Sequence, residues 1–148
     1  MRKAILLSIR PKFAEKIFSG EKTVELRRVY PSIERDDLAI IYVSSPVKAL
    51  YGAFKVSNIV KLPVNDLWEQ VKGKAGISVT EFYDYYKGKT TGVAIFFEEV
   101  WQLSVPLTLE SIQKLWIGFR PPQSYRYVNS GYLKAGLNLL NRKVERYK

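Results

Sequence analysis

Three charged residues in one short stretch, Lys22, Glu25 and Arg27, are the groups of this chain best placed to do chemistry. They follow Gly20, a residue type that commonly ends a helix in the left-handed conformation. Residues 23–28 alternate as in a strand, which places Glu25 and Arg27 on one face and Lys22 at the mouth of that strand. Three charges that converge at one end of a β-element are more typical of a ligand pocket than of a solvated face.

Each of these three groups has a chemistry suited to a nucleotide. The ammonium of Lys22 can contact a phosphate or a carbonyl oxygen. The carboxylate of Glu25 can accept a hydrogen bond from the exocyclic amine of a base, as carboxylates do with cytosine. Arg27 can either hold Glu25 in place or bind a phosphate with both arms of its guanidinium. A purely structural ion pair between Glu25 and Arg27 is the alternative.

Four further candidates lie at the ends of other predicted elements. Arg10 and Lys12 flank Pro11 at a predicted helix start, where free backbone amides favour anions. A solvated helix start explains these two residues equally well. Ser44 and Ser45 lead from a predicted strand into a turn and can offer hydroxyls to a base or ribose, although turn chemistry alone explains them better.

A loop near the end of the predicted fold interleaves basic and aromatic side chains around two prolines. Such a loop can stack a base and hold its phosphate, and its stiffness lowers the entropy cost of binding. The alternative is a loop that packs back onto the sheet. The candidate ligand-binding residues in this loop are Arg120, Gln123, Tyr125 and Arg126.

The 148-residue chain contains no cysteine and no histidine. Disulfides, thiol catalysis, imidazole general bases and nearly all zinc sites are therefore excluded. Any catalysis has to use lysine, carboxylates, hydroxyls, tyrosine or bound water, and we predict neither a metal nor a cofactor. Because 47% of the residues are hydrophobic, the chain can bury the core of one ordinary domain.

The net charge of +10 is unevenly distributed along the chain. Residues 1–28 hold eight basic and three acidic side chains, residues 29–110 hold eight and ten, and residues 111–148 hold eight and one. If the two basic ends meet in space, they form a positive surface suited to a phosphate backbone, so RNA or a nucleotide is the expected partner. Ordinary solubility charge is the alternative explanation.

Apolar and alternating runs predict a chain of sequential strands with helices inserted between them. This order does not alternate as in a parallel doubly wound sheet. We therefore predict an α+β fold, a small, mostly antiparallel β-barrel with peripheral helices. The predicted strands cover residues 4–9, 23–28, 38–43, 49–62 and 91–97 or further to 103, and the predicted helices cover 10–19, 64–71, 78–87, 109–116 and 132–147.

The whole of residues 1–148 is expected to form a single domain with a basic helical extension over about 130–148. That extension can contact nucleic acid or form a solvated face. The apolar run at residues 4–9 is too short for a signal-peptide core or a membrane span. We therefore expect a cytoplasmic protein without a membrane partner.

These motifs resemble those of the ASCH domain family within the PUA-like superfamily. The resemblance rests on residues 7–17 followed by Gly-x-Lys-x-x-Glu-x-Arg at 20–27. It is supported by Tyr-x-Ser-Ser-Pro at 42–46, by Gly52 and by Phe-Arg-Pro-Pro-Gln-Ser-Tyr-Arg at 119–126. The resemblance spans residues 4 to about 128. It implies a β-barrel with a cleft beside the first helix, RNA or modified-base binding, and a role as a coactivator or a regulator of transcription or translation.

One branch of that family consists of small amidohydrolases that act on acetylated cytidine and resemble Gly-x-Lys-Thr-x-Thr with a glutamate near the mid-chain helices. Gly20, Lys22 and Thr23 match, but Glu25 stands in place of the second threonine and residues 72–76 hold no acid. Ribonuclease activity has also been attached to relatives.

The sequence therefore predicts a module that binds RNA or a modified nucleotide in a basic cleft beside the first helix and the second strand. A small hydrolase of a modified nucleoside or of RNA, using Lys22, Thr23 and Glu25, is the alternative. A protein-interaction adaptor is a third class that stays open.

Overall fold

A computed structural model of the chain describes residues 4–128 and 144–147. The elements follow one another as β1 (Ala4–Ile9), α1 (Pro11–Ser19), β2 (Val24–Arg27), β3 (Leu38–Val43), β4 (Ala49–Pro63), α2 (Val64–Val71), α3 (Val79–Tyr85), β5 (Thr91–Thr108), α4 (Leu109–Leu115), β6 (Tyr125–Tyr127) and β7 (Val144–Tyr147).

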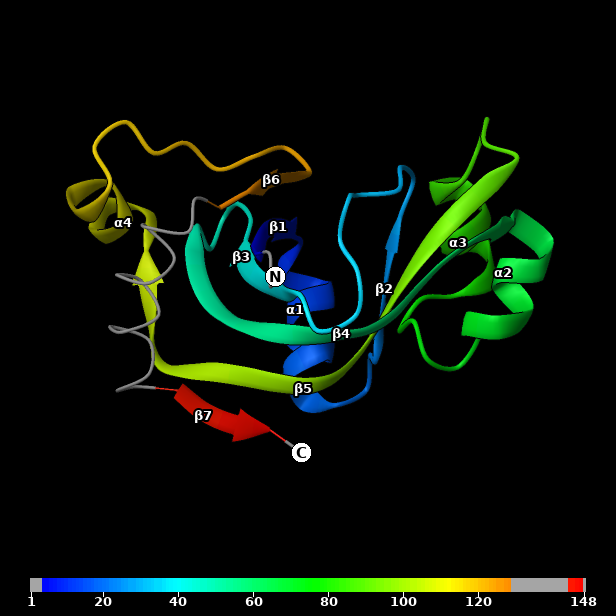
Figure 1. The fold of residues 1–148 in the computed structure, drawn as a ribbon, viewed down its shortest axis with the longest axis horizontal. Helices are drawn as coiled ribbons and strands as arrows, with labels where there is room; N and C mark the ends of the chain where they lie inside the picture. Colours follow the sequence, from blue (N-terminus) through cyan, green and yellow to red (C-terminus); the bar gives the residue numbers. More distant parts are fainter. Residues whose placement is uncertain (1–3, 129–143, 148) are drawn as a thin grey trace.

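One curled sheet forms the body of the described chain, with the strand order β2-β5-β4-β3-β1-β6 (Figure 1). The strands β1 and β3 pair in parallel, and the other neighbours are antiparallel. Because β4 occupies one edge of β5, both β2 and β7 pair along the other edge, at residues 93–96 and 100–103 respectively. The sheet wraps into a half-barrel, which confirms the predicted α+β class with a mostly antiparallel barrel.

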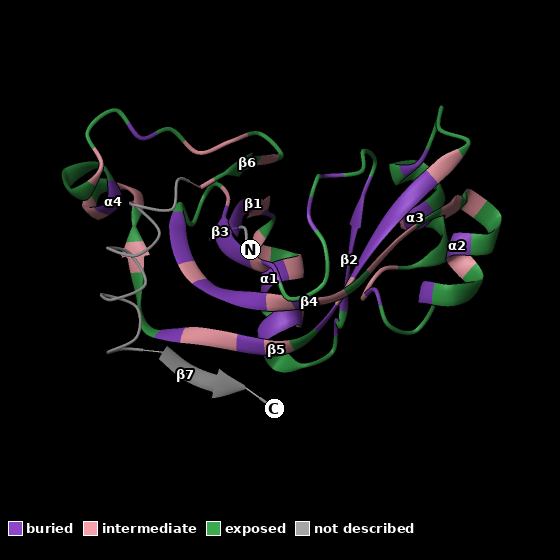
Figure 2. Cartoon of the chain, in the orientation of Figure 1, coloured by how far each residue is buried: buried purple, intermediate pink, exposed green. Residues whose placement is uncertain are grey.

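Helix α1 follows directly from the pattern of its sequence. Pro11 occupies its first turn, and the apolar side chains of Ala14, Ile17 and Phe18 are buried against the strands. The helix ends at Gly20, whose φ of 87° is the left-handed conformation that glycine adopts at little cost. Figure 2 shows the buried strands that surround α1, and this packing fixes where the chain enters β2.

The long hairpin of β4 and β5 carries α2 and α3 at its far end (Figure 1). The two strands approach so closely at Gly52 that a Cβ atom there would lie 2.0 Å from the backbone oxygen of Trp101. The ladder shifts register at this point, which is typical of a β-bulge. Buried side chains of α2 and α3, among them Leu67 and Phe82, pack against Val24 of β2, so that α3 lies beside the short second strand.

Helix α3 begins with a capping box, which the pattern Ser78-x-x-Glu81 indicates in the sequence. The backbone N–H of Glu81 donates to the Ser78 hydroxyl at 3.1 Å, and the backbone N–H of Ser78 donates to the Glu81 carboxylate at 3.2 Å. No helix in the described part of the chain is both long and apolar enough to cross a bilayer.

Two predictions near the end of the chain differ from the structure. The strand β6 lies in a stretch expected to be a loop, and it pairs with β1. Residues 144–147, expected to be helical, form β7 instead, because the edge of β5 at residues 100–103 offers backbone groups that a strand satisfies. The remainder of the predicted terminal helix and of the basic extension lies outside the described residues.

Candidate functional site

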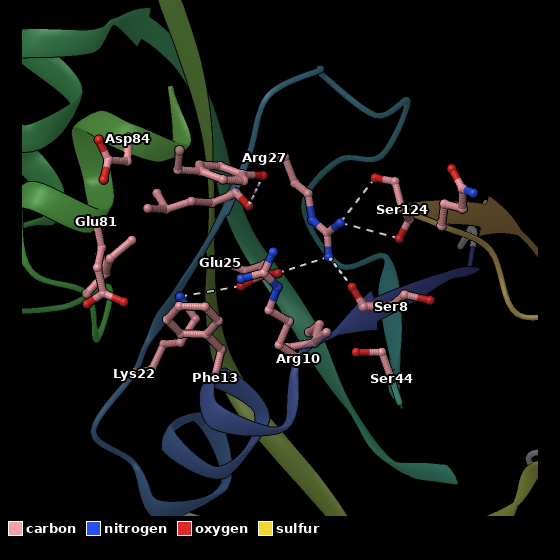
Figure 3. A pocket seen from close by; sticks show the side chains of 15 residues that line it. Ser8, Arg10, Phe13, Lys22, Glu25, Arg27, Ser44, Glu81, Asp84 and Ser124 are labelled. Carbon is pink, nitrogen blue, oxygen red and sulfur yellow. Dashed lines mark hydrogen bonds and ion pairs between the residues drawn. The ribbon is translucent and has the colours of Figure 1, made fainter. Parts of the chain in front are cut away.

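A cavity of about 600 Å³ opens where β1, β2, the start of α1 and the side of α3 meet (Figure 3). Its size lies within the range typical of small-molecule sites, about 300–1,000 Å³. Its lining combines three cations, three carboxylates, polar groups without charge and an apolar wall. The charged members are Arg10, Lys22, Arg27, Glu25, Glu81 and Asp84, and the others are Ser8, Ser44, Gln123, Ser124, Ile9, Phe13, Leu26, Ile77 and Tyr85.

Glu25 lies between the two buried cations of β2 and the turn before it. Its Oε1 atom is 3.4 Å from Nζ of Lys22, and its Oε2 atom is 2.9 Å from Nη2 of Arg27. None of the three side chains is more than 9% exposed. Buried charges of this kind persist when each is paired and hydrogen-bonded. The structural ion pair considered above is therefore present, and its members also line the cavity.

Lys22 belongs to the wall of the cavity rather than to its mouth, since only 3% of the residue is exposed. Its ammonium donates a hydrogen bond to the backbone oxygen of Ala75 at 2.7 Å and lies 5.4 Å from the ring centroid of Phe13. Burial lowers the pKa of Lys22, because the charged form loses its water, while the carboxylate of Glu25 acts in the opposite direction.

Arg27 connects β2 to the other end of the sheet. Its Nη1 group donates to the backbone oxygen and the hydroxyl of Ser124, at 3.3 and 3.2 Å, and its Nη2 group donates to the backbone oxygen of Ser8 at 3.2 Å. Its buried Nε group has no hydrogen-bond acceptor among the described residues. Unpaired buried donors are uncommon and call for an explanation such as a functional role.

Arg10 precedes α1 and is exposed, and in Figure 3 its side chain points from the start of the helix toward the middle of the cavity. Within the described residues it takes part in no ion pair and no side-chain hydrogen bond, in contrast to Lys22 and Arg27. The first turn of α1 also lacks a side-chain cap. Arg10 is therefore the lining cation whose charge is available to a ligand anion.

Sequence reasoning missed the two carboxylates that α3 contributes, Glu81 and Asp84. Glu81 forms an ion pair of 2.6 Å with Lys12, so Lys12 lies next to the cavity without lining it. This contact, followed by the backbone hydrogen bond from Ser78, lowers the pKa of Glu81 to about 2. The capping box placed Glu81 on a helix start, but only the packing of α3 against β2 reveals that this helix faces the cavity.

The remaining predicted residues divide into two groups. Ser44 and Gln123 line the cavity, and their role in ligand binding stays a prediction. The other five do not: Thr23, Ser45 and Arg120 are exposed outside it, Tyr125 packs against the core, and the guanidinium of Arg126 lies 5.7 Å from the ring centroid of Phe119. Among the described residues, no three acidic side chains form a group that could hold a metal ion.

Comparison with known proteins places this geometry in a family. The model of the ASCH domain matches residues 7–113. A protein of Zymomonas mobilis named ASCH domain-containing ribonuclease is 32% identical over 127 residues, which are 86% of this chain and 85% of the relative. The crystal structure of ASCH from Zymomonas mobilis superposes with a TM-score of 0.88 at 30% identity, covering 94% of this chain and 96% of the other.

A structure of a hypothetical protein from Leishmania major shares the fold alone, with a TM-score of 0.60 at 15% identity over 96% of each chain. The family match covers most of the chain, including the end of β1, all of α1 and β2, and the Lys22–Glu25–Arg27 group. The chain belongs to the ASCH domain family.

Proposed function

We propose that this protein binds single-stranded RNA, or a nucleotide unit of it, in the cavity between α1, β2 and α3. The observation that carries the proposal is the available charge of Arg10, which points into a cavity whose other two cations are held by Glu25. The net charge of +10 and the similarity to a protein named as a ribonuclease support the same ligand class.

Each part of the lining has a role in this proposal. Arg10 binds a phosphate, because a guanidinium presents paired donors to phosphate oxygens. The Ser44 hydroxyl and the Gln123 amide provide hydrogen bonds to ribose hydroxyls, which distinguish RNA from DNA. Lys22, Glu25 and Arg27 form the rigid floor that keeps these groups in place.

The proposal is tested by fluorescence anisotropy with a labelled single-stranded RNA of ten nucleotides at several salt concentrations. Arg10→Ala is expected to weaken binding about tenfold and to lower the slope of log affinity against log salt by about 1. Lys61→Ala, an exposed cation of β4 outside the cavity, is the matched control and is expected to change the affinity much less. Equal affinities for the wild type and Arg10→Ala would refute this assignment.

A second candidate function is cleavage of the RNA strand, favoured by the position of Lys22 in the lining of the cavity, where burial also lowers the pKa of its amine. In its neutral form, the amine can take the proton of a ribose 2′-hydroxyl. The 2′-oxygen then forms a bond to phosphorus, and the 5′-oxygen leaves and takes a proton from water. Because Thr23 lies outside the cavity, the amidohydrolase alternative lacks its expected hydroxyl at this site.

This second candidate is tested by incubating RNA, and separately acetylated cytidine, with the wild type and with Lys22→Arg. Arginine keeps the positive charge but does not release a proton at neutral pH, so Lys22→Arg should retain RNA binding and lose cleavage. Lys16→Arg is the matched control, because Lys16 donates to the oxygen of Gly76 next to the residue that Lys22 contacts. An absence of turnover by the wild-type protein would discard both hydrolase functions.

A further inference from the structure

The charged and polar groups that line the cavity are segregated into three regions. In Figure 3 the carboxylates of Glu81 and Asp84, which α3 provides, lie on one side, and the hydroxyls of Ser8, Ser44 and Ser124 lie on the opposite side. The cations Arg10, Lys22 and Arg27 lie between them. A lining with this order suits a ligand that carries an anion at its centre and hydrogen-bond donors at one end.

Two of the three carboxylates are already engaged. Glu25 is held by Lys22 and Arg27, and Glu81 is held by Lys12 and by the N–H of its own capping box. The exposed side chain of Asp84 takes part in no ion pair and no hydrogen bond within the described part of the chain. Asp84 therefore supplies the carboxylate oxygens available to a ligand.

The cavity that Asp84 lines also has surfaces suited to a flat ring. The hydroxyl of Tyr85 donates to the backbone oxygen of Leu26 at 3.2 Å, and its ring lies 4.9 Å from that of Tyr86, so its orientation is fixed. Phe13 and Ile77 add apolar surface to the same cavity. Aromatic and apolar walls with one polar acceptor are the usual means of holding an unstacked base.

We propose, on the basis of the RNA-binding function above, that this cavity selects a nucleotide whose base carries an exocyclic amine. Asp84 accepts a hydrogen bond from that amine, and Arg10 binds the phosphate of the same unit. Cytosine presents an amine where uracil presents a carbonyl oxygen, so uracil would direct its lone pairs at the carboxylate. An acceptor that meets another acceptor leaves both without a partner, and this mismatch rejects the wrong base.

The test compares the binding of two labelled RNAs, ten cytidines and ten uridines, at one fixed salt concentration. The two bases differ in the amine or carbonyl and in the protonation of the adjacent ring nitrogen, so the affinity ratio isolates this edge of the base. The wild type is expected to bind the cytidine oligomer about tenfold more tightly. Asp84→Asn is expected to bring the ratio close to one, because an amide can both accept and donate.

The absolute affinity for the uridine oligomer provides a second, independent test of the role of Asp84. Removal of the Asp84 charge is expected to leave the affinity for the uridine oligomer unchanged or higher, since a carboxylate repels the phosphates. Glu98→Gln, an exposed carboxylate of β5 outside the cavity, should keep the wild-type ratio.

Three results would overturn the inference. Equal binding of both oligomers by the wild type refutes the base selection and leaves the proposed RNA binding intact. A ratio that persists in Asp84→Asn refutes the role of Asp84. No binding of either oligomer by the wild type refutes the proposed function and the inference together.

Discussion

The guanidinium of Arg27 binds both the backbone oxygen and the hydroxyl of Ser124, 97 residues later in the chain. Arg27 belongs to β2, and Ser124 precedes β6, and these two strands are the first and last of the strand order. A side-chain contact therefore joins the two ends of the curled sheet at the position of the cavity (Figure 3).

Replacement of Arg27 tests how far this contact holds the fold together. Arg27→Leu leaves Glu25 with Lys22 as its one remaining cation and removes the bonds to Ser8 and Ser124. Removing one partner of a buried ion pair costs about 3 kcal/mol. The free energy of unfolding measured in urea should therefore fall by about that amount. The neighbouring Arg28→Leu, at an exposed site, should cost less than about 1 kcal/mol. Similar losses in both variants would contradict this role.

The buried ammonium of Lys22 should give the stability of the protein a dependence on alkaline pH. Burial lowers the pKa of Lys22 below its ordinary value of 10.5, so the unfolded chain binds more protons between the two values. The contribution of Lys22 to the free energy of unfolding should therefore rise with pH up to about 10.5.

The contribution of Lys22 can be separated from that of other titrating groups by comparing the wild type with a Lys22 variant. Burial raises the pKa of Tyr85 and Tyr86, which lowers stability above the ordinary tyrosine value of 10.0. The wild type and Lys22→Met share these tyrosines, so the difference in unfolding free energy between them should change in favour of the wild type as the pH rises from 7 to about 10.5. A difference that is constant over this range would exclude a lowered pKa at Lys22.

At acidic pH, the carboxylate of Glu81 should also make the free energy of unfolding rise with pH. Its hydrogen bond from Lys12 lowers the pKa to about 2, against an ordinary value of 4.5, so the folded chain releases this proton more readily than the unfolded chain. The stability it contributes is present above pH 4.5 and is lost as the pH falls toward 2. Thermal melts of Glu81→Gln should lose part of the acid dependence between these values, whereas Glu98→Gln should keep it. If the stability of Glu81→Gln depends on acidic pH as strongly as that of the wild type, this prediction is refuted.

The close approach of β4 and β5 should make Gly52 irreplaceable. A methyl group there would meet the oxygen of Trp101 at 2.0 Å, so Gly52→Ala has to separate the strands and should cost about 3 kcal/mol. Gly73→Ala is a useful comparison, because open space surrounds Gly73 and only its φ of 79° opposes a side chain. Strain of that kind costs about 1–2 kcal/mol. A loss at Gly52 no greater than at Gly73 in urea unfolding would contradict the close-approach explanation.

The parts of the fold that local patterns determine could be predicted from the sequence. The strand before Arg10, the helix that ends at Gly20 and the capping box at Ser78 depend on neighbouring residues, and each is present in the structure. The common face of Glu25 and Arg27 follows from strand alternation, and these two residues indeed meet in one ion pair.

The composition of the cavity could not be predicted in the same way, because it depends on contacts between distant segments. Asp84 faces the cavity because α3 packs against β2, and Ser124 lies there because β6 pairs with β1. The burial of Lys22 depends on the oxygen of Ala75, 53 residues away. The strand at residues 144–147 forms because it pairs with the edge of β5. The sequence of residues 144–147 alone does not indicate this pairing.

A two-dimensional amide NMR titration of the ¹⁵N-labelled protein with a single-stranded cytidine RNA would show directly whether RNA occupies this cavity. Amide shifts are expected to concentrate around the cavity, at Ser8, Arg10, Ser44, Tyr85 and Ser124, and Arg10→Ala should weaken them. Shifts confined to the far side of the sheet, with these amides unchanged at saturating RNA, would rule out binding in the cavity.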